Sequence, residues 1–200
     1  MSKGSATRGR IVETALRVAS VEGLEGISLG RLATDVGMSK SGLFAHFDCK
    51  EALQLDVLAA AVEKFRELVI APALTAPRGE PRLRALFDRW LAWGRHETLP
   101  GGCVFTHAIA ELDDRPGPAR DALAASQKEW LAFLAGAVRI AIDQGHLRRE
   151  VEPELVAFQI YGTILSYYHA ARLFRDPAAE SHARRSFDSI LDAARPPHPR

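Results

Sequence analysis

The segment Leu32-Ala33-Thr34-Asp35-Val36-Gly37-Met38-Ser39-Lys40-Ser41-Gly42-Leu43-Phe44-Ala45-His46-Phe47 carries the most informative pattern in this 200-residue sequence. Its apolar positions are spaced as in two short helices that cross at a turn, the helix-turn-helix arrangement. A small residue, Ala33, stands where the second helix crosses the first. Gly37 supplies a turn conformation that a residue with a Cβ adopts poorly. A generic helical hairpin shares this pattern, so the flanking sequence has to be considered as well.

The flanking segments also have helical periodicity, and no segment alternates convincingly with period two. Thr7 can cap a first helix that stops at Glu22-Gly23, and Ser28 opens a second that runs through Val36. Ser39 opens a third helix that runs to Phe47. Asp48 then caps a fourth, with Glu51 completing a capping box before the apolar run to Val69. A linker rich in Pro follows, and the remaining helices are predicted at 81–98, 103–113, 117–145, 153–175 and 178–195.

The sequence therefore predicts an all-α protein of two domains. The N-terminal domain, residues 1–52, contains a three-helix helix-turn-helix unit. The C-terminal domain, residues 53–195, is helical, and we expect residues 196–200 to form a disordered tail.

Composition narrows the class of protein. The chain is 47% hydrophobic and 26% charged, which is typical of a globular domain. The longest apolar stretch ends at Arg139, far short of the ~20 residues that span a bilayer, and the N-terminus has no apolar signal region. Two cysteines in different halves do not form a disulfide framework. We expect a cytoplasmic protein without a membrane partner.

Charge is modest, both overall and locally. The chain has a formal net charge of +1, and residues 1–50 contain seven Lys or Arg against five Asp or Glu. If this end binds nucleic acid, a second copy of the chain would help, because one copy offers few cations to phosphates.

Residues 7–53 resemble the DNA-binding domain of the tetracycline-repressor (TetR) family of bacterial regulators. The resemblance is carried by five motifs, which are Thr7-Arg8-Gly9-Arg10-Ile11, Ser28-Leu29 with Leu32-Ala33, Val36-Gly37-Met38-Ser39, Leu43-Phe44-Ala45-His46-Phe47, and Lys50-Glu51-Ala52-Leu53. It implies a homodimeric transcriptional regulator that binds double-stranded DNA at a palindromic operator. Since no paired-carboxylate site, Gly-rich phosphate loop or nucleophile elbow is evident in the sequence, we also expect no enzymatic activity. The recognition helix would be Ser39–Phe47, lying in the major groove.

The resemblance also implies which residues face DNA. Lys40, Ser41 and Ala45 would approach base edges, and Lys is a donor to guanine. The full predicted set, including phosphate and sugar contacts, is Arg8, Ser28, Arg31, Ser39, Lys40, Ser41, Gly42, Phe44, Ala45, His46 and Lys50. Phe44 stands where many members have a tyrosine whose hydroxyl reaches phosphate. Gly30 stands where some have a base-reading arginine, which leaves Arg31 as the nearer cation.

The C-terminal domain is expected to form the dimer. Gly162, Ser166 and Ala170 make a stripe of small residues on a helix that is apolar almost all round, and the last helix has an apolar face. The predicted interface residues are Gly162, Ser166, Ala170, Phe187, Ile190 and Leu191. The alternative is that these side chains face a neighbouring helix of the same subunit.

The same domain is expected to bind a small, largely apolar effector that releases a repressor from its operator, with no cofactor and no metal. The predicted ligand-binding residues are Trp90, Trp93, Phe105, His107, Trp130, Phe133, Phe158, Tyr161 and Tyr168. Aromatic residues at helical spacing are more often ordinary core. Cys103, His107 and Glu111 fall on one helix face, so a redox or metal sensor remains an alternative, as does a regulator without a ligand.

Overall fold

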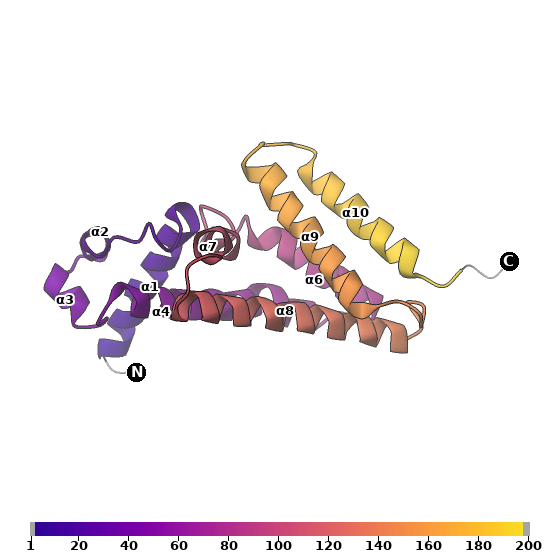
Figure 1. Ribbon diagram of the computed structural model, residues 1–200, viewed down its shortest axis with the longest axis horizontal. Helices are drawn as coiled ribbons and strands as arrows, with labels where there is room; N and C mark the ends of the chain where they lie inside the picture. Colours follow the sequence, from indigo (N-terminus) through magenta and orange to yellow (C-terminus); the bar gives the residue numbers. More distant parts are fainter. Residues whose placement is uncertain (1–2, 198–200) are drawn as a thin grey trace. The chain divides into compact units, whose positions relative to one another are not determined.

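The computed structural model describes residues 3–197 and contains only helices and connecting segments within that range (Figure 1). The predicted all-α class is confirmed. The elements in chain order are α1 (Lys3–Glu22), α2 (Leu29–Asp35), α3 (Lys40–Phe44), α4 (Lys50–Phe65), the π-helical turn η1 (Arg66–Ile70), α5 (Ala71–Ala73), α6 (Glu80–Trp93), α7 (Val104–Leu112), α8 (Pro118–Asp143), α9 (Pro153–Arg172) and α10 (Ala179–Ala194).

Two local predictions need correction. The third helix is shorter than predicted, because α3 ends at Phe44 and Ala45 forms its C-cap. The predicted capping box of Asp48 and Glu51 does not fit the start of α4, since the helix begins at Lys50 and Leu53 N bonds to the carbonyl of Cys49. For Asp48 to be the N-cap the helix would have to begin at residue 49, and α4 begins one residue later.

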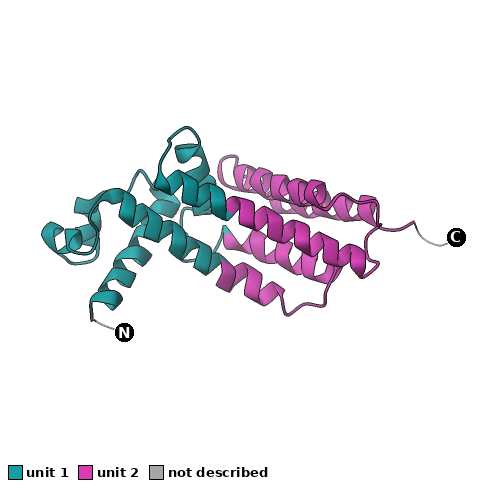
Figure 2. Cartoon of the chain, turned by 60° about the horizontal axis from the view of Figure 1, so that its bottom comes forward, with its two compact units in different colours: residues 1–65, 94–126 teal, residues 66–93, 127–200 magenta. Residues whose placement is uncertain are grey.

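The chain divides into two compact units (Figure 2). Unit 1 comprises residues 1–65 and 94–126, and unit 2 comprises residues 66–93 and 127–200. The division differs from the boundary predicted after residue 52, because the segment that contains α7 packs with α1 and α4. Of the predicted C-terminal tail, residues 198–200 lie outside the described residues.

The core of unit 1 is built from the apolar faces of its helices. Ile11, Ala15 and Ala19 of α1 are completely buried, as are Leu53 and Val57 of α4. From α7, Phe105 meets Phe65 of α4 edge to face, with 6.1 Å between ring centroids. Helix α7 is thereby part of the same core as the helix-turn-helix segment.

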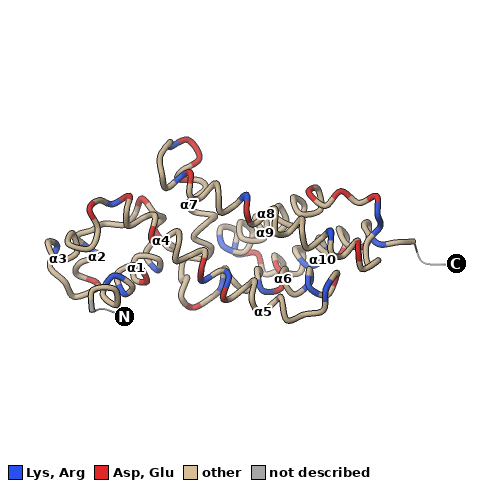
Figure 3. The backbone as a smooth tube through the Cα atoms, turned by 90° about the horizontal axis from the view of Figure 1, so that it is seen from below, with Lys and Arg blue, Asp and Glu red and all other residues tan. Residues whose placement is uncertain are grey.

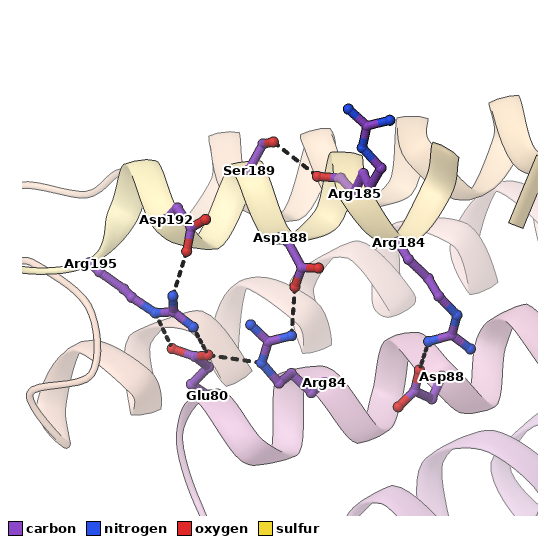
Figure 4. Close-up of polar contacts among 9 residues, drawn as sticks. All are labelled: Glu80, Arg84, Asp88, Arg184, Arg185, Asp188, Ser189, Asp192 and Arg195. Atoms are coloured by element: carbon purple, nitrogen blue, oxygen red, sulfur yellow. Dashed lines mark hydrogen bonds and ion pairs between the residues drawn. The ribbon is translucent and has the colours of Figure 1, made fainter. Parts of the chain in front are cut away.

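Unit 2 contains α6, α9, α10 and the second part of α8. Phe87 of α6 stacks on Phe187 of α10 with 4.1 Å between ring centroids. Ion pairs run beside this stack, joining Arg84 to Asp188 at 2.7 Å and Arg195 Nε to Glu80 at 2.9 Å (Figure 4). Helix α10 is therefore fixed to α6 by both apolar and ionic contacts.

No helix in the described part of the chain is long and apolar enough to cross a membrane.

Candidate nucleic-acid interface

The turn between α2 and α3 has the geometry that the sequence predicts. Gly37 has φ +70°, a left-handed conformation that favours glycine, and Met38 N bonds to the carbonyl of Ala33 at 2.8 Å. Ser39 caps α3, since its hydroxyl accepts a hydrogen bond from Gly42 N at 3.1 Å. We call α2, α3 and the turn between them the reading head.

The solvent side of the reading head consists of small and polar residues. Ser39, Lys40, Ser41 and Ala45 are exposed, and Phe44 has 40% of its surface exposed. Gly42 is half-buried, and a Cβ there would lie 3.1 Å from the capping hydroxyl of Ser39, so glycine leaves room for the cap. The apolar anchor on the other side is Leu43, which is completely buried.

Lys40 is the cation best placed on this face. Within residues 3–197 its ammonium group has no hydrogen-bond or ion-pair partner, so it is available to an incoming ligand. Basic and acidic positions are interspersed along the chain rather than gathered in one block (Figure 3). Binding to a polyanion therefore has to depend on a few well-placed cations.

Three other basic residues of the predicted set already have partners. Arg8 forms an ion pair with Asp56 at 2.8 Å, donates to the carbonyl of His46 and lies over the ring of Phe47. Its guanidinium group therefore ties α1 to α4 and to the end of the reading head. Its side chain remains 44% exposed, so one edge can still face solvent.

Arg31 and Lys50 are also engaged. Arg31 pairs with Glu22 at 2.6 Å, and its side chain is 59% exposed. Lys50 Nζ donates to the carbonyl of Glu25 at 2.6 Å, which the sequence did not predict. Ser28, the remaining polar member, is exposed and caps α2 through the amide of Arg31 at 3.5 Å.

Seven of the predicted effector-binding residues lie in unit 2. Trp90 packs edge to face on Trp130 at 5.0 Å and lies 5.7 Å from Tyr161, while Phe133 stacks on Trp130 at 5.6 Å. We call these four residues the aromatic cluster. The hydroxyl of Tyr161 donates to Gln127 Oε1 at 3.1 Å, which gives the cluster one polar edge.

Two further residues of these seven, Trp93 and Tyr168, are part of the packed core. Trp93 is 1% exposed, and the hydroxyl of Tyr168 donates to the carbonyl of Trp90 at 2.7 Å. Phe105 and His107 belong to α7 in unit 1, where Phe105 packs on Phe65.

Phe158 is 68% exposed on α9 and does not join the aromatic cluster, which corrects its predicted role. It lies one helical turn before Gly162, on the stripe that continues through Ser166 and Ala170. Periodicity failed here because a helix that is apolar all round does not reveal which aromatic residues face inward.

A groove of about 490 Å³ lies between α9 and α10 in unit 2. Its walls include Gly162, Ser166 and Ala170 from the predicted interface, together with Thr163, Tyr167, Ala179, His182, Ala183 and Ser186. The predicted residues Phe187 and Leu191 are 3% and 0% exposed and pack within the subunit, so they are corrected to core positions. Ile190 is half-buried.

The alternative of a metal sensor on α7 required Cys103, His107 and Glu111 as ligands, but Glu111 is engaged elsewhere. The carboxylate of Glu111 accepts a hydrogen bond from the amide of Leu24 at 2.7 Å, and Cys103 is 5% exposed. Within residues 3–197, no three His, Cys, Asp or Glu side chains are placed to hold a metal ion.

Comparisons with known proteins agree with this geometry. Residues 11–57 match the sequence model of bacterial regulatory proteins of the tetR family, and residues 79–187 match that of the tetracyclin repressor-like C-terminal domain. No curated protein matches the chain.

Many solved structures are similar to the chain. A TetR transcriptional regulator from Chloroflexus aurantiacus is 26% identical with a TM-score of 0.85, and the match covers 96% of each chain. AibR, solved in complex with isovaleryl coenzyme A and operator DNA, is 28% identical with a TM-score of 0.73, covering 96% of this chain and 99% of AibR. A tetR-family regulator from Cytophaga hutchinsonii shares the fold at 18% identity, with a TM-score of 0.86 and 98% of each chain covered.

The second family model spans more than half of the chain, and the first spans the helix-turn-helix segment with its exposed Lys40. The chain belongs to the tetR family of bacterial regulatory proteins and is a DNA-binding transcriptional regulator.

Proposed function

We propose that the protein is a homodimeric repressor that binds a palindromic operator and leaves it when a small, largely apolar effector binds unit 2. The observation that carries the DNA-binding part is Lys40, which is exposed and unpartnered among residues 3–197 on a helix held by a glycine turn and a serine cap. Two such helices in successive major grooves require inverted half-sites about one helical turn apart.

The groove between α9 and α10 supports a dimer through these helices. Its small residues Gly162, Ser166 and Ala170 allow another helix to approach closely, and the exposed Phe158 lies on the same stripe. In a two-fold interface the same patch serves both subunits, so an aromatic side chain beside a groove is self-complementary. The proposed interface comprises Phe158, Gly162, Ser166, Ala170 and Ile190.

The aromatic cluster supports an apolar effector. Trp90 and Trp130 are buried, whereas Phe133 and Tyr161 are half-buried and mark the side that a ligand can reach. Sites for small ligands combine such walls with a few polar groups, here the pair of Tyr161 and Gln127. AibR, which is similar over almost its whole length, was solved with isovaleryl coenzyme A, so short acyl thioesters belong among the compounds to test.

Release from DNA requires an effector that binds one arrangement of the two reading heads more tightly than the other. A ligand with equal affinity for both arrangements shifts nothing, however tightly it binds.

The experiment has two stages. Operator DNA is selected from a random duplex library and its complex is followed by fluorescence anisotropy. Fatty acids, aromatic metabolites and acyl-CoA thioesters are then titrated while tryptophan emission is recorded. We expect quenching and operator release at the same concentration, and we expect Trp130→Ala to weaken release but not DNA binding. Saturable DNA binding that no compound reverses would leave a regulator without an effector.

A further inference from the structure

The turn that leads from α1 into the reading head is held by side chains from two other helices. Glu111 of α7 accepts hydrogen bonds from the amides of Leu24 and Glu25 at 2.7 and 3.4 Å. On α4, Gln54 donates to the carbonyl of Leu24 at 3.2 Å and Lys50 to that of Glu25 at 2.6 Å. The four backbone groups of these two residues are thus satisfied by side chains, an arrangement that we call the Leu24 clamp.

The side chain of Glu25 adds charge to the clamp. Its carboxylate accepts from Gln54 at 2.9 Å, lies 3.3 Å from Lys50 Nζ and 3.7 Å from the guanidinium of Arg115. The hydrogen bond from Gln54, followed by Lys50 and Arg115, lowers the pKa of Glu25 below its ordinary value. The carboxylate stays ionised at neutral pH and holds both cations toward the turn.

Two glycines allow the close approach on which the clamp depends. Gly23 has φ +77°, and a Cβ there would lie 1.7 Å from Glu111 Oε1. Gly101 donates to the hydroxyl of Ser20 at 3.1 Å, and a Cβ there would lie 1.6 Å from the carbonyl of Ser20. The segment 94–126 is therefore fitted to the end of α1 at two separate points.

The clamp connects the reading head to a helix outside the family's DNA-binding segment. The matching family model covers residues 11–57, whereas Glu111 and Arg115 come from α7 and the loop after it. Leu24 is completely buried and Ile27 is 2% exposed, so the turn is rigidly packed before α2 begins. The clamp therefore links α7 to the turn that leads into α2.

We infer that Glu111 is a positioning residue for DNA binding, which holds the turn at Leu24 and so sets the position of the reading head relative to α4 and α7. This inference rests on the proposed binding of a two-half-site operator, where the separation of the two reading heads determines affinity. Glu111 does not touch DNA in this role. Its effect is carried by the amides of Leu24 and Glu25.

The test separates the reach of the side chain from its charge. Glu111→Gln keeps the length and an acceptor oxygen, Glu111→Asp keeps the charge but shortens the side chain, and Glu111→Ala removes both. Asp114→Ala is the matched control. Asp114 is exposed and lies three residues from Glu111, but its side chain takes no part in the clamp, so this substitution removes only a negative charge. Full-length proteins are titrated onto the selected operator and onto operators lengthened or shortened by one or two base pairs.

We expect Glu111→Gln to bind the best operator within about threefold of the unmodified protein. Glu111→Asp and Glu111→Ala should bind it about tenfold more weakly, since a part-buried hydrogen bond to a charged group is lost. Both should also discriminate less among spacings. Hydrogen exchange at the Leu24 amide should be faster in these two variants and unchanged in Asp114→Ala.

If Glu111 acted only through its charge, the change in DNA affinity would have the opposite sign. Removing an acidic charge near DNA tightens binding, so a merely electrostatic residue would give Glu111→Gln and Glu111→Ala an increased affinity. That result, or faster exchange at Leu24 with unchanged affinity and spacing preference, overturns the inference while leaving the proposed function intact. Failure of the unmodified protein to bind any selected DNA overturns the proposed function and the inference with it. If Glu111→Ala does not fold, the comparison of the Asp and Gln variants decides the question.

Discussion

Leu24 and Glu111 are 87 positions apart in the sequence, yet the amide of Leu24 donates to the carboxylate of Glu111 at 2.7 Å. This contact places α7 in the same compact unit as the helix-turn-helix segment. It also gives the reading head a support that does not come from its own sequence neighbours.

Lys40→Ala should relax base preference at one position of each half-site by about 1–3 kcal/mol, because its ammonium is available to a base edge. Competition binding with every base substituted in turn measures this. Lys128→Ala, which removes an exposed cation of unit 2, is the control and should leave the base preference unchanged. If Lys40→Ala instead lowered the affinity for all DNA sequences equally, Lys40 would contact a phosphate rather than a base.

Lys50→Ala should weaken operator binding, but it should reduce the slope of affinity against salt concentration by less than the loss of one phosphate contact would. The family resemblance implies that Lys50 lies near phosphate, but its Nζ donates to the carbonyl of Glu25 at 2.6 Å. The substitution should lower the free energy of unfolding. A double-mutant cycle with Glu25→Ala should give a coupling energy of roughly 0.2–1 kcal/mol, as for other partly exposed ion pairs. Binding measured over a range of salt concentrations distinguishes the roles, since a direct phosphate contact reduces the slope by about one.

Gly162→Leu and Phe187→Ala should have different consequences. A Cβ at Gly162 would meet no atom within 4 Å in the subunit, so the larger side chain is tolerated there but obstructs a partner helix. Phe187 stacks on Phe87 and is 3% exposed, so its truncation should destabilise the fold by about 3–5 kcal/mol. Light scattering and urea unfolding report the two effects. A Gly162→Leu protein that stays dimeric would exclude this face as the interface.

The stability contributed by Glu80 should depend on pH. Hydrogen bonds from Arg195, followed by the one from Arg84, lower the pKa of Glu80 below the ordinary value of 4.5. Because the folded pKa is lowered, the contribution is present above pH 4.5 and is lost as the pH falls through the folded value. Glu80→Gln should cost about 1–2 kcal/mol at pH 7, and this difference should shrink in acid.

Urea unfolding of both proteins from pH 7 to pH 3 measures this difference. Glu150→Gln, an exposed acid on the same unit, is the control. A difference that persists undiminished at the lowest pH would show that Glu80 acts through packing rather than charge.

Local sequence information was sufficient for most of the fold. Gly37 and Ser39 fix the turn and the start of α3 through contacts within five residues, and such contacts are visible in the sequence. The start of α9 and both ends of α10 were predicted to within one residue, whereas α9 ends at Arg172, three residues before the predicted end.

The misplaced site residues share a different cause. Phe158 and Phe187 both lie on amphipathic or all-apolar helices, and only the packing of α9 and α10 shows that Phe158 faces out and Phe187 faces in. Lys50 and Glu111 act through partners 25 and 87 positions away, which no local pattern encodes. The one available indication was Gly23, whose left-handed turn leaves space for Glu111.

The most direct test of a homodimeric, operator-binding repressor is selection of bound duplexes from random DNA with the purified full-length protein, followed by sequencing. A homodimeric repressor should enrich a consensus of two inverted half-sites with a fixed separation, bound by one dimer. In Lys40→Ala the base preference at one position of each half-site should be lost. Enrichment of single, unpaired sites, or no enriched sequence at all, would rule out this mode of binding.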